Sequence, residues 1–206
     1  MKSLFPIFVK LEHRPVLVVG GGRVGEQKIR SLLATGARIH VVAPEATEAI
    51  QAWARCDEII FEARAFLSSD LDGIFLVVAA TSSQELNERI FEEARCRGVL
   101  CNVVDAPEHC DFYYPAVVQR GDLQIAISTA GQSPSLAGQI RQQLEGRFVP
   151  EYGEWVAELG ETRRRVLASN LGAESKRDLL QSFASPVAFE ALVAAQSRTR
   201  EGSGAA

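Results

Sequence analysis

The chain has 206 residues, a formal net charge of −4 and a sequence pI of about 5.5, a balance that argues against nucleic acid as the main partner. Its 47% apolar and 23% charged residues are typical of a globular protein with an ample core. No apolar run approaches the ~20 residues of a membrane-spanning helix. The four cysteines form no Cys-x-x-Cys pair, which favours reduced thiols and a cytoplasmic protein over a metal site.

The first 112 residues alternate short apolar runs with helical patterns, the order expected of a doubly wound parallel sheet in an α/β fold. An extended apolar lead-in at residues 4–11 is expected to pack beside the first strand. A short turn or helix is expected at 66–71. We expect strands at 16–19, 39–43, 58–63, 73–80 and 99–104, and helices at 25–35, 46–55 and 84–97.

The pattern changes after Asp105. Two short strands, at 113–119 and 122–128, are expected to form an antiparallel pair with one solvated face. Ser133 followed by Pro134 predicts the start of a helix that runs to about residue 148. Further helices are expected beyond residue 150, with breaks near 170–172 and 185–186, and the last residues, 200–206, read as a disordered tail.

Three glycines between the first strand and the first helix, Gly20, Gly22 and Gly25, match the pattern G-x-G-x-x-G. Gly20 allows a tight turn, Gly22 lets a pyrophosphate approach the backbone, and Gly25 lets the helix pack close to the sheet. The helix N-terminus then favours the anion. The alternative is a bare structural turn, but a strand before and a helix after favour dinucleotide binding.

The end of the second strand departs from the usual fingerprint of this fold. The acid that would hold the ribose hydroxyls is missing at Ala43-Pro44, and Glu45 comes just after. Either Glu45 serves from the loop or backbone groups do this work. No arginine lies immediately there for a 2′-phosphate, which weakly favours NAD over NADP.

In an open parallel sheet, ligands bind beyond the carboxyl ends of the strands. Four stretches are expected there: 20–25, 43–45, 80–83 and 102–107. Asp105 follows an apolar strand and precedes Pro107, so its carboxylate suits a general base or a cation ligand. A plain turn cap explains the same position equally well.

The polar loop from Ser128 to Pro134 offers hydroxyls and a helix N-terminus to a second anionic group, although an ordinary capped loop is the simpler interpretation. Arg120, Arg141 and Arg147 are candidates for pairing substrate carboxylates, and each is also a common solvated charge. His109 and Cys110 are adjacent metal-ligand types without partners nearby in sequence, which is weak support for a metal site. Trp53 and Trp155 have helical spacing with apolar neighbours and are expected in the core.

Taken together, these motifs resemble the precorrin-2 dehydrogenase/sirohydrochlorin ferrochelatase family, which includes the N-terminal half of bifunctional sirohaem synthases. The strings that carry the resemblance span about residues 4–150. They are Pro6-Ile-Phe, Val18-Val-Gly-Gly-Gly-Arg-Val-Gly, Ala79-Ala-Thr, Cys101-Asn-Val-Val-Asp-Ala-Pro, Tyr114-Pro-Ala and Ser133-Pro-Ser-Leu-Ala. The match beyond residue 150 is loose, and no methyltransferase domain follows, so the chain resembles a stand-alone form.

The resemblance implies NAD-dependent oxidation of precorrin-2 to sirohydrochlorin and, in some members, insertion of Fe²⁺ or Co²⁺, in a homodimer. It places the catalytic aspartate at Asp105, with no fixed metal site and Asp105 as at most a transient metal ligand. A serine that is phosphorylated in some members aligns with Thr129. The expected cofactor contacts are Gly20, Gly22, Arg23, Val24, Gly25, Pro44, Glu45, Thr81 and Asn102, and the expected substrate contacts are Ser128, Thr129, Gly131, Ser133, Arg120 and Arg141.

The implied fold is a Rossmann domain at 1–112, a dimerisation region at 113–149 whose strands exchange between subunits, and a helical domain at 150–199. The rival from another functional class is an NAD-sensing regulatory module that acts through a protein partner. Such a sensor needs neither Asp105 nor the Ser128–Pro134 loop, so that pair of features favours the enzyme. A short-chain dehydrogenase is disfavoured because the chain lacks a Tyr-x-x-x-Lys pair.

Overall fold

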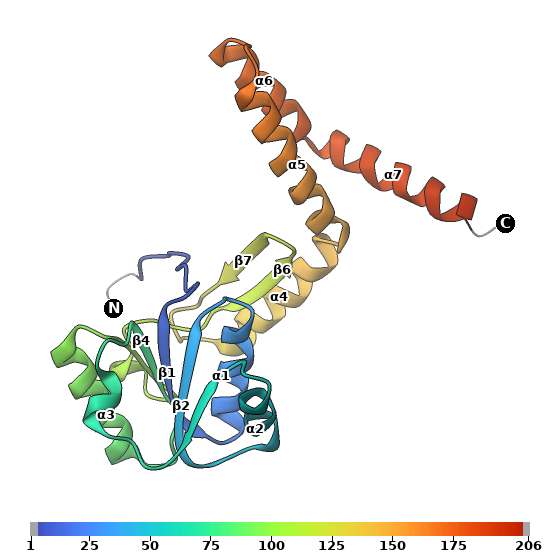
Figure 1. The fold of residues 1–206 in the computed structure, drawn as a ribbon. Coiled ribbons are helices and arrows are strands. Elements are labelled where there is room, and N and C mark those ends of the chain that lie inside the picture. Colours follow the sequence, from blue (N-terminus) through green and yellow to red (C-terminus); the bar gives the residue numbers. More distant parts are fainter. Residues whose placement is uncertain (1–3, 204–206) are drawn as a thin grey trace. The chain divides into compact units, whose positions relative to one another are not determined.

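The computed structural model describes residues 4–203, with side chains through residue 194. The chain divides into two compact units, Met1–Tyr114 and Pro115–Ala206, close to the predicted end of the first domain at residue 112 (Figure 1). The second unit contains both the predicted strand pair and the predicted C-terminal helices.

The first unit is built on a five-stranded sheet in the order β3-β2-β1-β4-β5, with every neighbouring pair parallel. This order confirms the predicted doubly wound α/β fold, and it brings the carboxyl ends of all five strands to one edge of the sheet. The strands are β1 (Pro15–Gly21), β2 (Arg38–Ala46), β3 (Ile60–Ala63), β4 (Leu76–Ala79) and β5 (Leu100–Val103).

The connecting helices start and stop at residues whose local chemistry favours those ends. Thr47 and Ser83 cap two helices by accepting a hydrogen bond from a backbone N–H in the first turn. Gly98 ends the third in a left-handed conformation with φ of 69°. The helices are α1 (Arg23–Leu33), α2 (Glu48–Arg55) and α3 (Gln84–Arg97), with short 3₁₀ turns η1 (Ser68–Leu71) and η2 (Pro107–His109).

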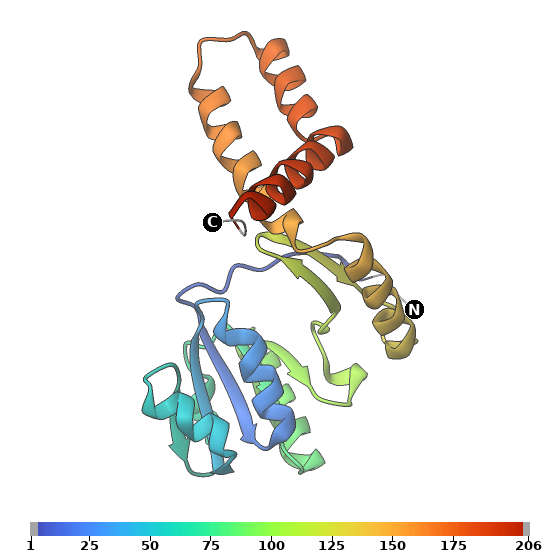
Figure 2. The ribbon, with the colours of Figure 1, turned by 90° about the vertical axis from the view of Figure 1, so that its right-hand side faces the viewer.

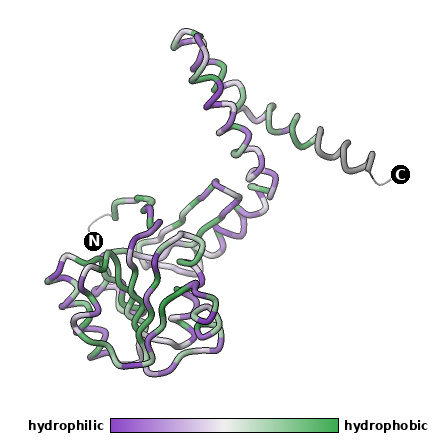
Figure 3. Tube along the Cα trace, viewed as in Figure 1, coloured by the Kyte–Doolittle hydropathy of each residue, from purple (hydrophilic) through white to green (hydrophobic). Residues whose placement is uncertain are grey.

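The central strands are buried on both faces. Along β1, Val16 and Val18 pack into one apolar cluster and Leu17 and Val19 into the other. Figure 3 shows these strands as the most apolar part of the trace. A helix layer on each face removes the need for polar alternation, which is why the sequence shows continuous apolar runs. Each fully buried Val or Leu contributes about 1.5–3 kcal/mol.

The last residue of the apolar lead-in, Leu11, packs against the apolar cluster that contains Val16 and Val18, but the prediction that the whole lead-in packs beside the first strand is wrong. Residues 4–10 form no strand, and Phe5, Ile7 and Phe8 are 84%, 65% and 69% exposed. The reason lies in the strand order. Because β1 is paired with β2 on one side and β4 on the other, it has no edge left for another strand.

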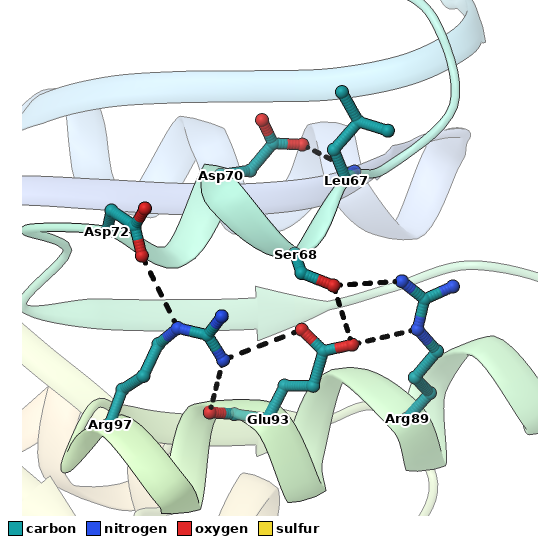
Figure 4. Close-up of polar contacts among 7 residues, drawn as sticks. All are labelled: Leu67, Ser68, Asp70, Asp72, Arg89, Glu93 and Arg97. Atoms are coloured by element: carbon teal, nitrogen blue, oxygen red, sulfur yellow. Dashed lines mark hydrogen bonds and ion pairs between the residues drawn. The ribbon is translucent and has the colours of Figure 1, made fainter.

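A polar network fastens η1 to α3 on one face of the sheet (Figure 4). Glu93 accepts hydrogen bonds from Ser68 at 2.9 Å and from Arg89 at 2.8 Å, and it also pairs with Arg97. Arg97 reaches back to Asp72 at 3.4 Å. The bond from Arg89 is the main reason that the pKa of Glu93 lies below its usual range. This network fixes the loop that leads into β4.

The second unit begins with an antiparallel pair, β6 (Ala116–Arg120) and β7 (Leu123–Ile127). Helix α4 (Pro134–Arg147) starts at the predicted Ser133 cap and packs against this pair, burying Val118 and Ala137. Helices α5 (Glu151–Ala168), α6 (Ala173–Phe183) and α7 (Pro186–Ser203) follow, separated by the two predicted breaks (Figure 2). Within residues 4–203, no helix combines the length and apolar character needed to cross a bilayer.

Aromatic rings join α5 to α7. Tyr152 lies 4.1 Å from Phe189 between ring centroids, and Trp155 lies 5.0 Å from the same ring. Trp53, in the first unit, packs half-buried against the sheet core. Helix α7 continues to Ser203, because extending a helix costs little once its first turn exists. Residues 200–203 of the predicted disordered tail are therefore helical, and residues 204–206 lie outside the described residues.

Candidate functional site

The glycine loop after β1 is held by two close backbone approaches. Gly20 has φ of +119°, and a Cβ there would lie 2.3 Å from the carbonyl oxygen of Ala80. A Cβ on Gly25 would lie 2.1 Å from the carbonyl oxygen of Gly20. Both positions therefore require glycine, the first to turn beside β4 and the second to let α1 rest on that turn, as the sequence predicts.

Gly22 differs from its neighbours because it faces open space. It is the N-cap of α1 with an ordinary φ of −78°, and no heavy atom lies within 4 Å of a Cβ built on it. No side chain of the described residues caps this helix end. The first-turn N–H groups, including those of Arg23 and Val24, therefore remain for an external acceptor. An uncapped helix N-terminus under an open backbone fits a pyrophosphate.

Gly21 is a third glycine on which the loop geometry depends, and the sequence analysis did not single it out. A Cβ there would lie 2.2 Å from the carbonyl oxygen of Glu45, and Thr47 donates its N–H to the Gly21 carbonyl at 2.9 Å. Gly21 pairs with Ala46 after a shift in register. This contact ties the end of β2 to the glycine loop, and the run of three glycines was the available signal.

Because of that contact, β2 continues to Ala46 and Glu45 lies within the strand rather than in a loop, which corrects the prediction. Pro44 and Glu45 border an open cleft of about 750 Å³ beside α2 and β3. The exposed Arg55, in the last turn of α2, lines the same cleft. The cleft thus offers an acidic and a basic group next to the position where a Rossmann fold holds the adenosine ribose.

Thr81 is held at the carboxyl end of β4 by Asn87, a residue that the sequence analysis missed. The Thr81 hydroxyl donates to Asn87 Oδ1 at 2.7 Å, and Asn87 Nδ2 donates to the Thr81 carbonyl at 3.1 Å. Asn87 is only 7% exposed. Its spacing on the same helical face as Ile90 and Ala94 was the signal, since a polar residue on a buried face needs an internal partner.

The outer edge of β5 is covered by the returning segment 110–112, which Asn102 and Asp111 hold in place; we call these contacts the β5 clasp. Asn102 is 6% exposed and donates to the Phe112 carbonyl at 2.8 Å and to the Cys110 sulfur at 3.3 Å. The Cys101 N–H donates to the Asp111 carboxylate at 2.9 Å. The Asn102 amide N–H group, expected to contact cofactor, therefore holds the returning segment 110–112 in place.

Asp105 stands in the turn between these clasped segments. It has φ of +60°, a left-handed conformation that Asp tolerates better than most residues. The turn is closed by backbone bonds from Ala106 to Val103 and from His109 to Ala106. The Asp105 side chain is exposed and accepts no hydrogen bond within residues 4–194, so it does not cap the turn. Its carboxylate is available to a ligand at the carboxyl edge of the sheet.

The neighbouring thiols and histidine are engaged in packing. Burial raises the pKa of Cys101 to about 12, and burial likewise raises the pKa of Cys110. The His109 ring contacts Phe91 of α3, with 4.9 Å between centroids. All four cysteines are unpaired thiols. Among the described side chains, no three His, Cys, Asp or Glu residues gather closely enough to hold a metal ion.

The Ser128–Pro134 loop belongs to the second unit, and its hydroxyls stabilise its own backbone. Ser128 accepts from the Ala130 N–H, Thr129 from the Ser133 N–H, and Ser133 from the Leu136 N–H. Gly131 has φ of +79° within the same turn. Each hydroxyl accepts through oxygen and keeps its own hydrogen to donate, so the loop presents three donors.

The two arginines expected to bind substrate have internal partners. Arg120 donates to the carbonyls of Phe148 at 2.7 Å and Glu145 at 3.1 Å, at the end of α4. Arg141 forms an ion pair with Glu145 one turn along the same helix. Part of each guanidinium is already occupied by these contacts. Arg120 or Arg141 would have to release one of them before all of its N–H groups could bind a substrate carboxylate.

Two family models match consecutive parts of the chain. Residues 7–116 match the family described as "Putative NAD(P)-binding", and residues 120–147 match "Sirohaem biosynthesis protein central". The first match covers more than half of the chain and contains the glycine loop, the β2 cleft and Asp105.

Curated relatives and a solved structure agree with these models. Siroheme synthase from Ectopseudomonas mendocina (strain ymp) is 46% identical over 162 residues, 79% of this chain and 34% of that protein. Siroheme synthase 1 from Aeromonas hydrophila subsp. hydrophila is 40% identical over 166 residues, 81% of this chain and 36% of that protein. This chain thus spans about a third of the length of these relatives.

The solved structure of SirC, precorrin-2 dehydrogenase, superposes with a TM-score of 0.80 at 27% identity, covering 96% of this chain and 98% of that one. That likeness runs through both units, including the helices after residue 150, where the sequence resemblance is loose. The chain therefore belongs to the sirohaem-biosynthesis family in which an NAD(P)-binding domain, here residues 7–116, is followed by the sirohaem central segment.

Proposed function

We propose that the chain is an NAD-dependent dehydrogenase that oxidises precorrin-2 to sirohydrochlorin. The observation that carries the proposal is Asp105: an exposed carboxylate without an internal partner, on the sheet edge that also carries the glycine loop. The likeness to SirC, precorrin-2 dehydrogenase, over nearly the whole length of both chains supports the same activity.

The oxidation removes one hydride and one proton from the tetrapyrrole. Bound NAD⁺ supplies the hydride acceptor. On this chain, the glycine loop and the α1 N-terminus bind the pyrophosphate, and the clasp formed by Asn102 and Asp111 fixes the backbone on either side of Asp105. The Asp105 carboxylate accepts the proton as a general base, so both hydrogens lost by the substrate are accounted for.

The β2 cleft supports NAD rather than NADP. Glu45 is exposed in that cleft, and a carboxylate there accepts hydrogen bonds from ribose hydroxyls and repels a 2′-phosphate. Arg55, which lines the same cleft, is a feature that favours NADP. Titration of the protein with NAD⁺ and with NADP⁺ measures the preference, and we expect the lower Kd for NAD⁺. Replacing Glu45 by Gln should reduce the difference between the two Kd values.

The test of the function is an anaerobic assay of the purified protein with precorrin-2 and NAD⁺, followed by the absorption change to sirohydrochlorin. Replacing Asp105 by Asn should leave NAD⁺ affinity intact and lower turnover about 10²–10⁴-fold. The matched control is Glu108→Gln, which removes a charge from an exposed residue of the same turn and should turn over normally. Unchanged turnover in Asp105→Asn would remove this residue from the mechanism.

A second step of that assay tests whether the protein also inserts a metal ion into sirohydrochlorin. Insertion of Fe²⁺ or Co²⁺ into sirohydrochlorin requires two pyrrolic protons to leave, and the same Asp105 carboxylate can assist that loss. Adding each metal after oxidation is complete tests it against a protein-free control. If NAD⁺ binds but neither reaction accelerates, the enzyme proposal fails and an NAD-sensing module becomes the better account.

We also infer that the chain works as a homodimer through residues 113–149. The β6–β7 pair is a two-stranded sheet, which is marginal alone, and each strand has an unpaired outer edge among the described residues. Pairing of these edges between two copies satisfies the exposed backbone groups. Light scattering after gel filtration should give twice the chain mass. A proline at Val117, an exposed position in β6, should lower that mass if the strand pairs between copies.

We place the protein in the cytoplasm. The four unpaired cysteines support a reducing compartment, because thiols in oxidising compartments are usually paired. Fractionation of cells that express a tagged chain tests this placement.

A further inference from the structure

Lys28 lies near Asp105 and has no role in the site described so far. It sits in the second turn of α1, just after the glycine loop, and its side chain is half-buried. Its Nζ lies 3.9 Å from the centroid of the Tyr114 ring, a cation–π distance. Tyr114 ends the first unit, so all of these residues belong to one compact body.

Among the side chains that the structure describes, the Lys28 ammonium has no acceptor of its own. Within residues 4–194, no carboxylate pairs with Lys28 Nζ and no oxygen accepts a hydrogen bond from it. Arg30, two residues further along the same helix, differs in forming an ion pair with Glu26 at 2.9 Å. The three N–H groups of Lys28 are therefore left to water or to a ligand.

Besides Tyr114, two titratable groups are close enough to influence Lys28 through their charge, namely Asp105 and Cys110. Burial is the main influence on Lys28 and lowers its pKa, while the charges of Asp105 and Cys110 act in the opposite direction. Lys28 is likewise the cation whose charge acts on Cys110. The ammonium therefore lies within the electrostatic reach of Asp105 but is not paired with it.

The charge of the proposed substrate suggests a role for Lys28. Precorrin-2 is a polycarboxylate, and its ring must approach a turn that is itself rich in acidic residues. Three acidic residues, Asp105, Glu108 and Asp111, fall within the seven residues 105–111. A substrate carboxylate that flanks the reacting edge would be repelled there unless a cation offsets the charge. An ammonium held on an aromatic face, with unused donors, meets that need.

We propose that Lys28 binds a carboxylate side chain of the tetrapyrrole next to Asp105, with the Tyr114 ring as the platform that holds the ammonium in place. This inference rests on the proposed function and names a substrate contact for the same site. Lys28 anchors the substrate, and the proton still passes to Asp105.

The test compares Lys28→Met, which keeps the length of the side chain and removes its charge, with Lys28→Arg, which keeps the charge. Arg30→Met is the matched control, since it removes one positive charge from the same helix at an exposed position. Loss of one charge-assisted contact should raise the KM for precorrin-2 about 10- to 100-fold in Lys28→Met. The kcat and the NAD⁺ affinity should change little, and Lys28→Arg should restore most of the lost affinity.

Direct binding of sirohydrochlorin without NAD⁺ gives a readout that is independent of turnover. Its Kd should rise in Lys28→Met by the same factor as the KM, and should depend less on salt than that of the unaltered protein. Equal Kd and KM in Lys28→Met and in the unaltered protein would overturn the inference while leaving the enzyme proposal standing. If the unaltered protein neither binds nor oxidises the tetrapyrrole, the proposed function itself fails.

Discussion

The contact between α1 and the glycine loop gives the sharpest prediction about folding. Replacing Gly25 by Ala places a Cβ 2.1 Å from the carbonyl oxygen of Gly20. A carbon and an oxygen in ordinary contact lie about 3.3 Å or more apart. The helix must therefore move away from the turn by about 1 Å, and the obstructing atom is backbone, which cannot rotate aside.

The cost follows from two opposing effects. Overpacking of this kind typically costs about 1–3 kcal/mol. Alanine returns at most about 1 kcal/mol because it favours a helix more than glycine does. Because the obstructing atom is backbone, the cost should lie in the upper part of that range, and we expect Gly25→Ala to lower the free energy of unfolding by about 1–2 kcal/mol. The midpoint of thermal unfolding should fall by several degrees, given about 4 °C per kcal/mol for a domain of this size.

Gly22→Ala is the matched comparison, because the added methyl enters open space at an ordinary φ. Its free energy of unfolding should change by only about 0.5 kcal/mol, the size of an N-cap effect, while its Kd for NAD⁺ should rise about tenfold or more because the methyl occupies the pyrophosphate approach. Urea unfolding of the apo protein and calorimetric titration with NAD⁺ measure the two quantities. If Gly25→Ala is as stable as the unaltered chain, or Gly22→Ala binds NAD⁺ equally well, the geometric argument is refuted.

Three further predictions concern the scaffold. The Asp70 side chain, 8% exposed, accepts a hydrogen bond from Arg64 at 2.7 Å, and this bond is the main reason that the pKa of Asp70 lies below its usual range. Asp70→Asn should lower the free energy of unfolding, measured with urea near neutral pH, by about 1–3 kcal/mol. Because the pKa is lower in the folded state, this contribution is complete above the unfolded pKa and disappears as pH falls below about 4, so the variant should lose less stability than the unaltered chain on acidification. Ser83→Ala removes the α3 cap and should cost about 1 kcal/mol by the same measurement. Asn87→Ala leaves Thr81 without its buried partner, and should weaken NAD⁺ binding in a titration as well as lower the thermal midpoint.

Local chemistry explains why so much of the fold could be predicted. The ends of α3 and α4 follow from Ser83, Gly98 and Ser133, which act on backbone groups within a few residues of themselves. The central strands β1 and β4 follow from continuous apolar runs, which are typical of a parallel sheet covered on both faces. The same strings carry the family resemblance, which the two family models confirm.

The failures share a cause, which is dependence on partners distant in sequence. The lead-in could not be placed without knowing that β1 is central in the strand order. The length of β2 depends on Gly21, whose role appears only once the Glu45 carbonyl is known to lie against it. The internal partners of Arg120 are carbonyls 25 and 28 residues away. The roles of site residues that depend on such distant contacts can be assigned only from the structure.

The clasp at β5 has a consequence for the chain's behaviour in concentrated solution. An outer strand of a sheet is a template on which a second molecule can add its own strand, the first step towards fibrils. Here the returning segment 110–112 occupies that template through Asp111 and Asn102. The opposite outer strand, β3, has only four residues and carries Glu62, with Arg64 just after it. Loss of the β5 clasp would thus expose the outer edge of β5, the more apolar of the two outer strands. A substitution there would then cause aggregation as well as a loss of catalytic geometry.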